Sequence, residues 1–549
     1  MFFIQIFIFL ISIVLLSFSI IGFGSMMTRN SKPNFCIDFF FGLIVLSLVV
    51  TVVHFFFRVN ILLNISLFIL GLILFLKGAN FNYFKDQKKI NIRYLMIILP
   101  LIPMYISQKY HEDFGYYHLP YALAFIEEKI VFGFANLDQS YVYNSIWLNL
   151  TSIFFLKDKN FDFLTLPSFI LFLIFITFLF KSLFKEKITK VSDYYLLIIL
   201  FYFILKFTRI SEFGVDIPAI IFSILSIYYF LKYFDTDEIS EKKIIFFYNV
   251  AFSIFSILIK FSTVPILVLT FYLYFKNFRD FKFYILSYKF LIIYSLFLIY
   301  FIQQFIYTGC LFFPTNITCF DVSWFNENYI YLSKKIELIN KSYSVAREIY
   351  SPEEYLTNLN WFPYWIKRNY IEILEHLITI ILPIFIFISF LKRTESKKIV
   401  LKEKKIFYFF IFINFIFWLN FSPVYRFGVH IFITISFIIL LNFLNSKEFS
   451  KKILIIFTSI FLFFSFSKNI FRIINEEDIF IGIKKIDNQY ILREDISSEY
   501  VKIFRPDIEN NKKNGWQGRL CWNTPFICSY NKLEVKRKNG YLVIIKIDN

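Results

Sequence analysis

The chain has 549 residues, of which 58% are hydrophobic and 23% aromatic, and its mean hydropathy is +0.62. This composition excludes a soluble globular domain for most of the chain and indicates a polytopic α-helical membrane protein. A formal net charge of +18 would suggest a nucleic-acid partner in a soluble protein. Here the basic residues lie in short loops between apolar stretches, so we expect membrane lipid and no nucleic acid as a partner.

Apolar stretches that could cross a membrane recur along the whole chain. A helix that crosses the hydrocarbon core needs about 20 mainly apolar residues, and about fourteen stretches meet that criterion. The first begins "FFIQIFIFLISIVLL" and lacks both a basic leading segment and a small-x-small cleavage site. We interpret it as a retained helix and not as a signal peptide.

Lysine and arginine gather in alternate loops, most strongly in "LKRTESKKIVLKEKK" at 391–405. The positive-inside rule makes these loops cytoplasmic. The outer segments are then 108–162, 207–216, 308–370, 421–427 and the tail after about 468. We therefore expect a multi-pass protein of the bacterial cytoplasmic (inner) membrane with both termini outside.

The expected organisation has four parts. N-terminal transmembrane helices fill 1–107, and an outer loop at 108–162 contains amphipathic helices that lie on the membrane face. A transmembrane core at 163–467 includes a second outer loop at 308–370. The tail, 468–549, is polar with short alternating runs, which predicts a small outer α+β module.

The cysteines agree with this sidedness. Four of the five fall in predicted outer segments, and disulfides persist on the oxidising side of a membrane. We expect Cys310 to pair with Cys319 and Cys521 with Cys528, which leaves Cys36 as a thiol. The alternative is that these cysteines serve only as small apolar residues.

The segment "HEDFGYYHLP" at 111–120 concentrates polar residues directly after an apolar stretch. Acids beside hydrocarbon are costly unless they line a wet cavity. Glu112 or Asp113 could act as a general base or ligate a divalent cation. The alternative is a cap for the helix that follows. His118 is either part of such a site or an ordinary interfacial hydrogen-bonding residue.

A second cluster lies in "TRISEFGVDIPAIIF", which contains Arg209, Glu212 and Asp216. Asp216 precedes an apolar run with Pro218 near its start, a pattern typical of a helix N-cap. The competing interpretation is a charged group at an outer cavity mouth. Lys260, at an outer boundary, suits a phosphate, although a lysine at the end of a span commonly reaches toward the interface.

Arg426 occupies a short outer turn in "SPVYRFG". An uncompensated guanidinium there would be costly, so Arg426 should have an anionic partner. Its planar donor fork matches a phosphate bidentately, and a plain ion pair with an outer acid is the alternative.

The segment "EDFGYYHLPYALAFIEE" resembles the first outer-loop motif of bacterial membrane glycosyltransferases of the GT-C superfamily, the polyprenyl-phosphate-sugar-dependent enzymes similar to dolichyl-phosphate-mannose mannosyltransferases. The resemblance implies that Asp113 is the catalytic base and that Tyr117 and His118 belong to the adjoining motif. "KFSTVP" and "SPVYRFG" look like later segments of the same group, which implies contacts from Lys260 and Arg426 to the donor phosphate. The chain also looks close to proteins that carry this fold without an assigned reaction.

These observations predict a membrane glycosyltransferase that moves a sugar from a polyprenyl-phosphate donor to a glycan, lipid or protein acceptor at the outer face. Asp113 is the expected base. Glu112 is the second catalytic candidate, and Glu112, His118 or Asp216 could also shape the site or hold a divalent cation. The residues expected to bind substrate or phosphate are His118, Tyr117, Asp216, Arg209, Lys260 and Arg426. Alternatives are a surface-polysaccharide polymerase or ligase, a transporter or flippase, and an envelope scaffold. The low number of glycines, 14, and the absence of an internal repeat both argue against a transporter.

Overall fold

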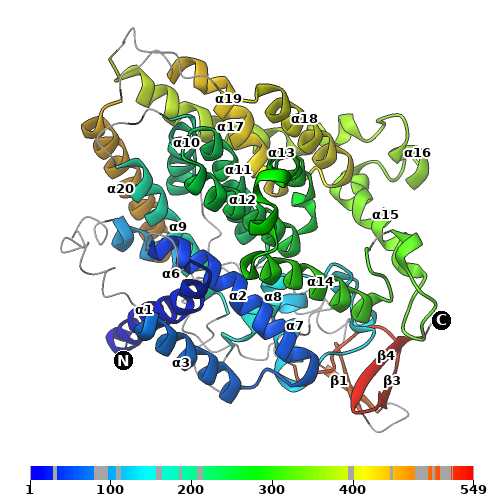
Figure 1. Cartoon of the computed structure of the whole chain (residues 1–549). Helices are drawn as coiled ribbons and strands as arrows, with labels where there is room; N and C mark the ends of the chain where they lie inside the picture. Colours follow the sequence, from blue (N-terminus) through cyan, green and yellow to red (C-terminus); the bar gives the residue numbers. More distant parts are fainter. Residues whose placement is uncertain are drawn as a thin grey trace.

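The computed structural model in Figure 1 describes residues 2–28, 34–78, 97–106, 113–155, 164–184, 188, 190–206, 214–313, 315–392, 401–444, 449–475, 492–496, 501–506, 521 and 524–547. The protein is mostly helical, with short strands near the C-terminus.

The first part of the chain forms α1 (Phe2–Thr28), α2 (Phe35–Phe56), α3 (Ile61–Gly78), η1 (Leu99–Leu101), α6 (Ile102–Ile106), η2 (Phe114–His118), α7 (Leu119–Glu127), η3 (Phe134–Asn136), η4 (Gln139–Val142) and α8 (Ile146–Ser152). The middle part forms α9 (Leu166–Leu183), α10 (Val191–Lys206), α11 (Asp216–Phe234), α12 (Ile239–Ile259), η5 (Phe261–Ile266), α13 (Leu267–Ile285) and α14 (Tyr288–Thr308).

The last part forms η6 (Asn316–Thr318), α15 (Asn328–Asn340), η7 (Tyr343–Val345), α16 (Pro352–Leu356), α17 (Phe362–Ser389), α18 (Lys404–Phe421), η8 (Tyr425–Phe427), α19 (Val429–Leu444) and α20 (Lys451–Asn475). The strands are β1 (Leu492–Ile496), β2 (Lys502–Pro506), β3 (Leu533–Lys538) and β4 (Tyr541–Lys546).

Within the described ranges, eleven helices are long and apolar enough to cross a membrane. This finding confirms a multi-pass membrane protein. The sequence criterion gave about fourteen stretches along the whole chain. Within the described residues, Val429–Leu441 of α19 is a further, shorter apolar helix.

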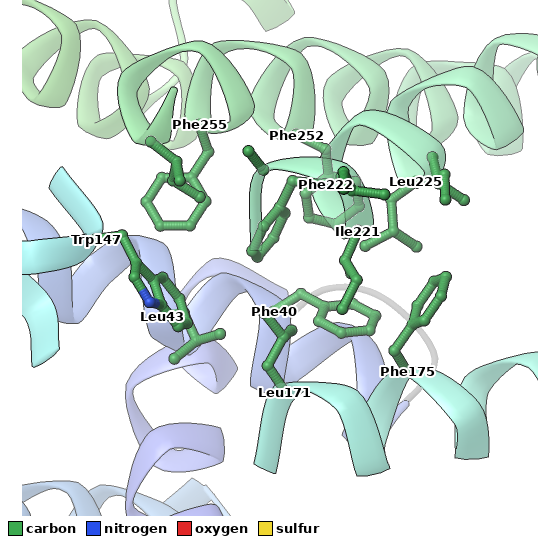
Figure 2. Packing of buried hydrophobic residues seen from close by; sticks show 14 of the residues in the cluster. Phe40, Leu43, Trp147, Leu171, Phe175, Ile221, Phe222, Leu225, Phe252 and Phe255 are labelled. Atoms are coloured by element: carbon green, nitrogen blue, oxygen red, sulfur yellow. The ribbon is translucent and has the colours of Figure 1, made fainter. Parts of the chain in front are cut away.

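The centre of the bundle is packed with aromatic rings from α2, α9, α11 and α12, as Figure 2 shows. The Phe40 ring lies edge-on to the rings of Phe178, Phe222 and Phe252, with centroids 6.0, 6.0 and 6.1 Å away. Lipid tails are as apolar as these side chains, so close packing holds such helices together more than exclusion from water does. Each edge-to-face pair adds about 0.5–1.5 kcal/mol beyond its buried area.

Glycines let α1 and α2 approach closely. A Cβ added to Gly42 would lie 1.9 Å from the carbonyl oxygen of Ile20, and one added to Gly24 would lie 1.6 Å from that of Asp38. Both contacts are with backbone, which cannot move aside without separating the helices. The α1–α2 pair therefore depends on the absence of side chains at these two positions.

We expect Gly42→Ala to destabilise the protein by about 1–3 kcal/mol, the usual cost of overpacking. The measurement is the thermal unfolding midpoint of the purified protein in detergent. Gly78→Ala is the matched control, because its Cβ would meet only the rotatable side chain of Ser25, at 3.0 Å from Oγ. Equal midpoints for both variants would contradict the close-packing argument.

The first loop is buried more deeply than helices lying on a membrane face would be. All seven residues of α8 are buried, and α8 contacts α2, α7 and α12. Trp147, the second residue of α8, is fully buried. The sequence interpretation assumed that one side of this segment faces lipid headgroups, but neighbouring helices surround it.

The C-terminal strands form two antiparallel hairpins, β1–β2 and β3–β4. The β3–β4 turn is Asn539-Gly540, and both residues have positive φ, the geometry that a two-residue hairpin turn requires. The structure contains the disulfides Cys310–Cys319 and Cys521–Cys528, and Cys36 is a buried thiol.

The strand β4 is attached to the first loop. The backbone N–H of Phe132 donates to the carbonyl of Leu542, and the N–H of Ile544 donates to the carbonyl of Phe132, each at 2.9 Å. The Asn136 side chain donates to the carbonyl of Ile544 at 2.8 Å, and Ser529 Oγ donates to that of Leu137 at 2.6 Å. Figure 1 shows the strands at one end of the bundle, near α7.

Thiol labelling tests the disulfides. In protein unfolded without reductant, we expect a thiol reagent to modify Cys36 alone, and after reduction to modify all five cysteines. Mass spectrometry counts the added groups. A Cys36→Ser variant should then carry no label before reduction. More than one label on the unreduced wild-type chain would show that a pair is open.

Candidate functional site

A cavity of about 660 Å³ brings together residues from distant parts of the chain. Its charged lining residues are Asp113, Asp216, Lys260, Glu337 and Arg426. Tyr117 and His118 also line it, as do the Phe312 and Phe313 rings from the loop closed by the Cys310–Cys319 disulfide. These charged residues all come from segments, or segment boundaries, that the charge pattern assigns to the outer face.

The carboxylate of Asp216 lies between two cations. Lys260 Nζ forms an ion pair with Asp216 Oδ1, and Arg426 Nε lies 3.4 Å from Asp216 Oδ2. Asp216 is the first residue of α11, Lys260 lies between α12 and η5, and Arg426 is in η8. The N-cap of α11 is Val215, so the carboxylate of Asp216 serves an ion pair and not a cap.

The ring of Phe427 supports both cations. Lys260 Nζ lies 3.1 Å from its centroid and Arg426 Cζ 5.2 Å. Burial lowers the pKa of Lys260 to about 8, while the carboxylate of Asp216 opposes this shift. At neutral pH the ammonium is therefore charged, and two cations share one carboxylate at this corner of the cavity. Such a corner suits an anionic ligand.

Asp113 directly precedes a single π-helical turn, η2, which continues into α7. Pro120 lies in the first turn of α7. Single π turns are frequent at functional sites. The Asp113 side chain makes no capping hydrogen bond, so the capping alternative is not supported, and Asp113 lines the cavity instead.

Tyr117 and His118 follow Asp113 on the same turn. Burial raises the pKa of the Tyr117 phenol well above its usual range, and the charge of Asp113 adds to this shift. The phenol therefore stays protonated and can donate a hydrogen bond but cannot serve as a base. His118 is buried, with its ring centroid 4.1 Å from that of Tyr117.

Most residues predicted from the sequence meet in this cavity, namely Asp113, Tyr117, His118, Asp216, Lys260 and Arg426. Glu112 and Arg209 lie outside the described residues. The sequence argument missed Glu337 on α15, although an acid at helical spacing from other polar residues in a predicted outer loop was a usable signal. In the part of the chain that the structure describes, no group of three or more His, Cys, Asp and Glu side chains is placed to hold a metal ion.

The fold and cavity define a multi-pass helical membrane protein whose inter-helix segments build one charged cavity. Residues 1–433 match the family described as "Domain of unknown function (DUF8201)", and the chain belongs to that family. The match includes every charged residue that lines the cavity and ends before α20 and the strands. No curated protein and no solved structure matches the chain.

A double-mutant cycle tests the central ion pair. We expect Asp216→Asn and Lys260→Met each to destabilise the protein by about 2 kcal/mol. Asp216→Asn leaves two neighbouring cations without their anion, and Lys260→Met leaves the partly buried carboxylate with Arg426 alone. The double variant should lose clearly less than the sum. Thermal unfolding midpoints measure the effects. Lys276→Met is the control, because its 2.7 Å pair with Glu403 is more exposed and should contribute little. Additive losses at the 216–260 pair would contradict direct coupling.

Proposed function

We propose that the protein is a membrane glycosyltransferase that moves a sugar from a polyprenyl-phosphate donor to an acceptor at the outer face of the membrane. The observation that carries the proposal is the cavity itself, in which a carboxylate, Asp113, shares one space with a pair of cations, Lys260 and Arg426. A base for a nucleophile and cations for a leaving phosphate are the two requirements of such a transfer.

The proposed reaction needs a single displacement. Asp113 accepts the proton of an acceptor hydroxyl, and that oxygen attacks the anomeric carbon of the donor sugar. The bond from this carbon to the phosphate oxygen breaks, and the phosphate keeps the electron pair. Lys260 and Arg426 stabilise the released charge. Because the nucleophile replaces the leaving group in one step, the anomeric configuration inverts.

Asp216 is the proposed positioning residue for the phosphate. Its carboxylate engages Lys260 and the Nε of Arg426. A guanidinium also carries donors on both Nη atoms, in the fork geometry that suits phosphate oxygens. A donor phosphate would thus enter a corner where the cations are already oriented, which lowers the cost of binding.

The positions of the charges favour a transferase over a transporter. Asp216 begins α11, Lys260 lies between two candidate spans, and Arg426 lies in η8 between α18 and α19. A translocation path would require such groups near the middle of the membrane. Both disulfides also lie in segments assigned to the outer side, where they persist.

Substitution of the proposed base tests the reaction. In cells deleted for the gene, we expect wild type to restore a missing envelope glycan and Asp113→Asn to fail, because an amide cannot accept the proton. Mass spectrometry of glycans and polyprenyl lipids provides the measurement. Lys335→Gln, an exposed change on α15, is the control for expression and insertion. Full restoration by Asp113→Asn at equal protein level would remove Asp113 from the mechanism.

The pKa of Lys260 predicts how phosphate binding depends on pH. Below about 8 the ammonium is charged, and above it the charge is lost, so affinity for undecaprenyl phosphate should fall as pH rises through this value. Lys260→Arg should flatten the profile, because arginine stays charged. Thermal shift with undecaprenyl phosphate measures both variants. Binding by wild type that strengthens above this pH would contradict a contact between Lys260 and phosphate.

A further inference from the structure

Helix α15 presents one stripe of residues to the cavity. Ser333, Ile336, Glu337 and Asn340 line it, and their spacing of i, i+3, i+4 and i+7 places them on one helix face. The stripe is about 10 Å long at 1.5 Å per residue. Lys334 and Lys335 lie on the opposite, exposed side.

Both ends of α15 are attached to elements that border the cavity. Near the first end, the Tyr329 hydroxyl donates to Asn136 Oδ1 in η3. At the other end, Asn340 Nδ2 donates to Ser422 Oγ, next to α18, at 3.3 Å. The helix therefore bridges the first loop and the end of α18 as a fixed wall.

A buried lysine holds Glu337 in place. Lys341 Nζ lies 2.5 Å from Glu337 Oε1, and the lysine side chain is only 5% exposed. Its ammonium also lies 4.7 Å from the ring centroid of Trp361, and its carbonyl accepts a hydrogen bond from the Tyr355 hydroxyl at 2.7 Å. A buried ammonium requires an ionised partner. Glu337 is thus a fixed carboxylate at the cavity wall.

Other residues that line the cavity are neutral and polar. Asn144 and Gln304 line it, and each is held in place: the Asn144 N–H donates to Gln304 Oε1 at 3.2 Å, and Gln304 Nε2 donates to the carbonyl of Val142 at 2.8 Å. The rings of Tyr143 and Phe313 stand edge to face at 5.2 Å beside them. The lining cations, Lys260 and Arg426, pair with Asp216.

We propose that α15 forms the binding wall for a glycan acceptor, with Glu337 accepting hydrogen bonds from its hydroxyls and Asn340 adding an amide contact. This inference rests on the proposed function and names the acceptor class. A sugar ring has hydroxyls at its edge and C–H groups on its faces, so it needs fixed carboxylate and amide groups beside apolar surface, as here. An extended peptide that binds by adding a strand would instead require a free strand edge, and a phosphate would favour the cations that pair with Asp216.

Two binding probes test the wall on the full-length protein in detergent. The first is the mixture of oligosaccharides released by mild acid from the envelope glycans of the same cells, and the second is undecaprenyl phosphate. Native mass spectrometry measures retention of each. We expect Asn340→Ala and Glu337→Gln each to weaken oligosaccharide binding about tenfold, the effect of losing a polar contact in a cavity, and to leave undecaprenyl phosphate binding unchanged.

Control variants separate binding from folding. Asn340→Ala leaves the Glu337–Lys341 pair intact but removes the hydrogen bond to Ser422, so the unfolding midpoint of each α15 variant is measured beside its binding. Lys335→Gln should change neither probe. Lys260→Met should weaken undecaprenyl phosphate binding and leave oligosaccharide binding intact.

The outcomes distinguish the two proposals. Oligosaccharide binding that is absent from wild type, or unchanged in both α15 variants, overturns the glycan wall. Selective retention of peptides from a defined peptide library, lost in those variants, also overturns it and identifies a protein acceptor. Wild type that binds oligosaccharides but no undecaprenyl phosphate leaves the wall in place and removes the donor from the proposed function.

Discussion

The cavity depends on one carboxylate, that of Asp216, which lies between the ammonium of Lys260 and the guanidinium of Arg426. These residues come from three separate elements, and without a shared anion two cations at the edge of a hydrocarbon layer would repel each other and hold the elements apart. The same arrangement has a functional consequence. In the proposed function, Asp216 offsets part of the positive charge of the two cations and engages the Nε of Arg426, so the donor phosphate meets the Nη donors.

The sequence predicted the cavity residues best where a charge stood beside apolar residues. Asp113, Lys260 and Arg426 are conspicuous because charge near hydrocarbon is expensive. The role of Asp216 was harder to predict, since an acid before an apolar helix usually caps it and its partners are distant in sequence. Glu337 escaped notice because its partner, Lys341, is at i+4, where helix surfaces commonly carry ordinary exposed pairs. Only tertiary structure shows that this lysine is buried beneath Trp361.

Sequence reasoning meets the same limit in predicting the fold. Length and hydropathy indicated a multi-pass helical protein, but they cannot separate a helix that faces lipid from one enclosed by other helices. The residues of α10 from Val191 to Ile204 are all buried, and α10 contacts α9, α11, α17, α19 and α20. An enclosed helix is apolar on every side. The burial of α8 was not predicted for a related reason, since two of its three neighbours, α2 and α12, are far away in sequence.

The attachment of β4 to the first loop also orders events in time. Phe132 and Asn136 form hydrogen bonds with residues 542–544, and Asn136 also accepts one from Tyr329 of α15. During synthesis, the loop that carries Asp113 leaves the ribosome hundreds of residues before β4 does. Until β4 is synthesised, the backbone N–H and carbonyl of Phe132 and the side-chain amide of Asn136 lack their partners on that strand. The first loop therefore gains its contacts with β4 last, after every residue that lines the cavity has been synthesised.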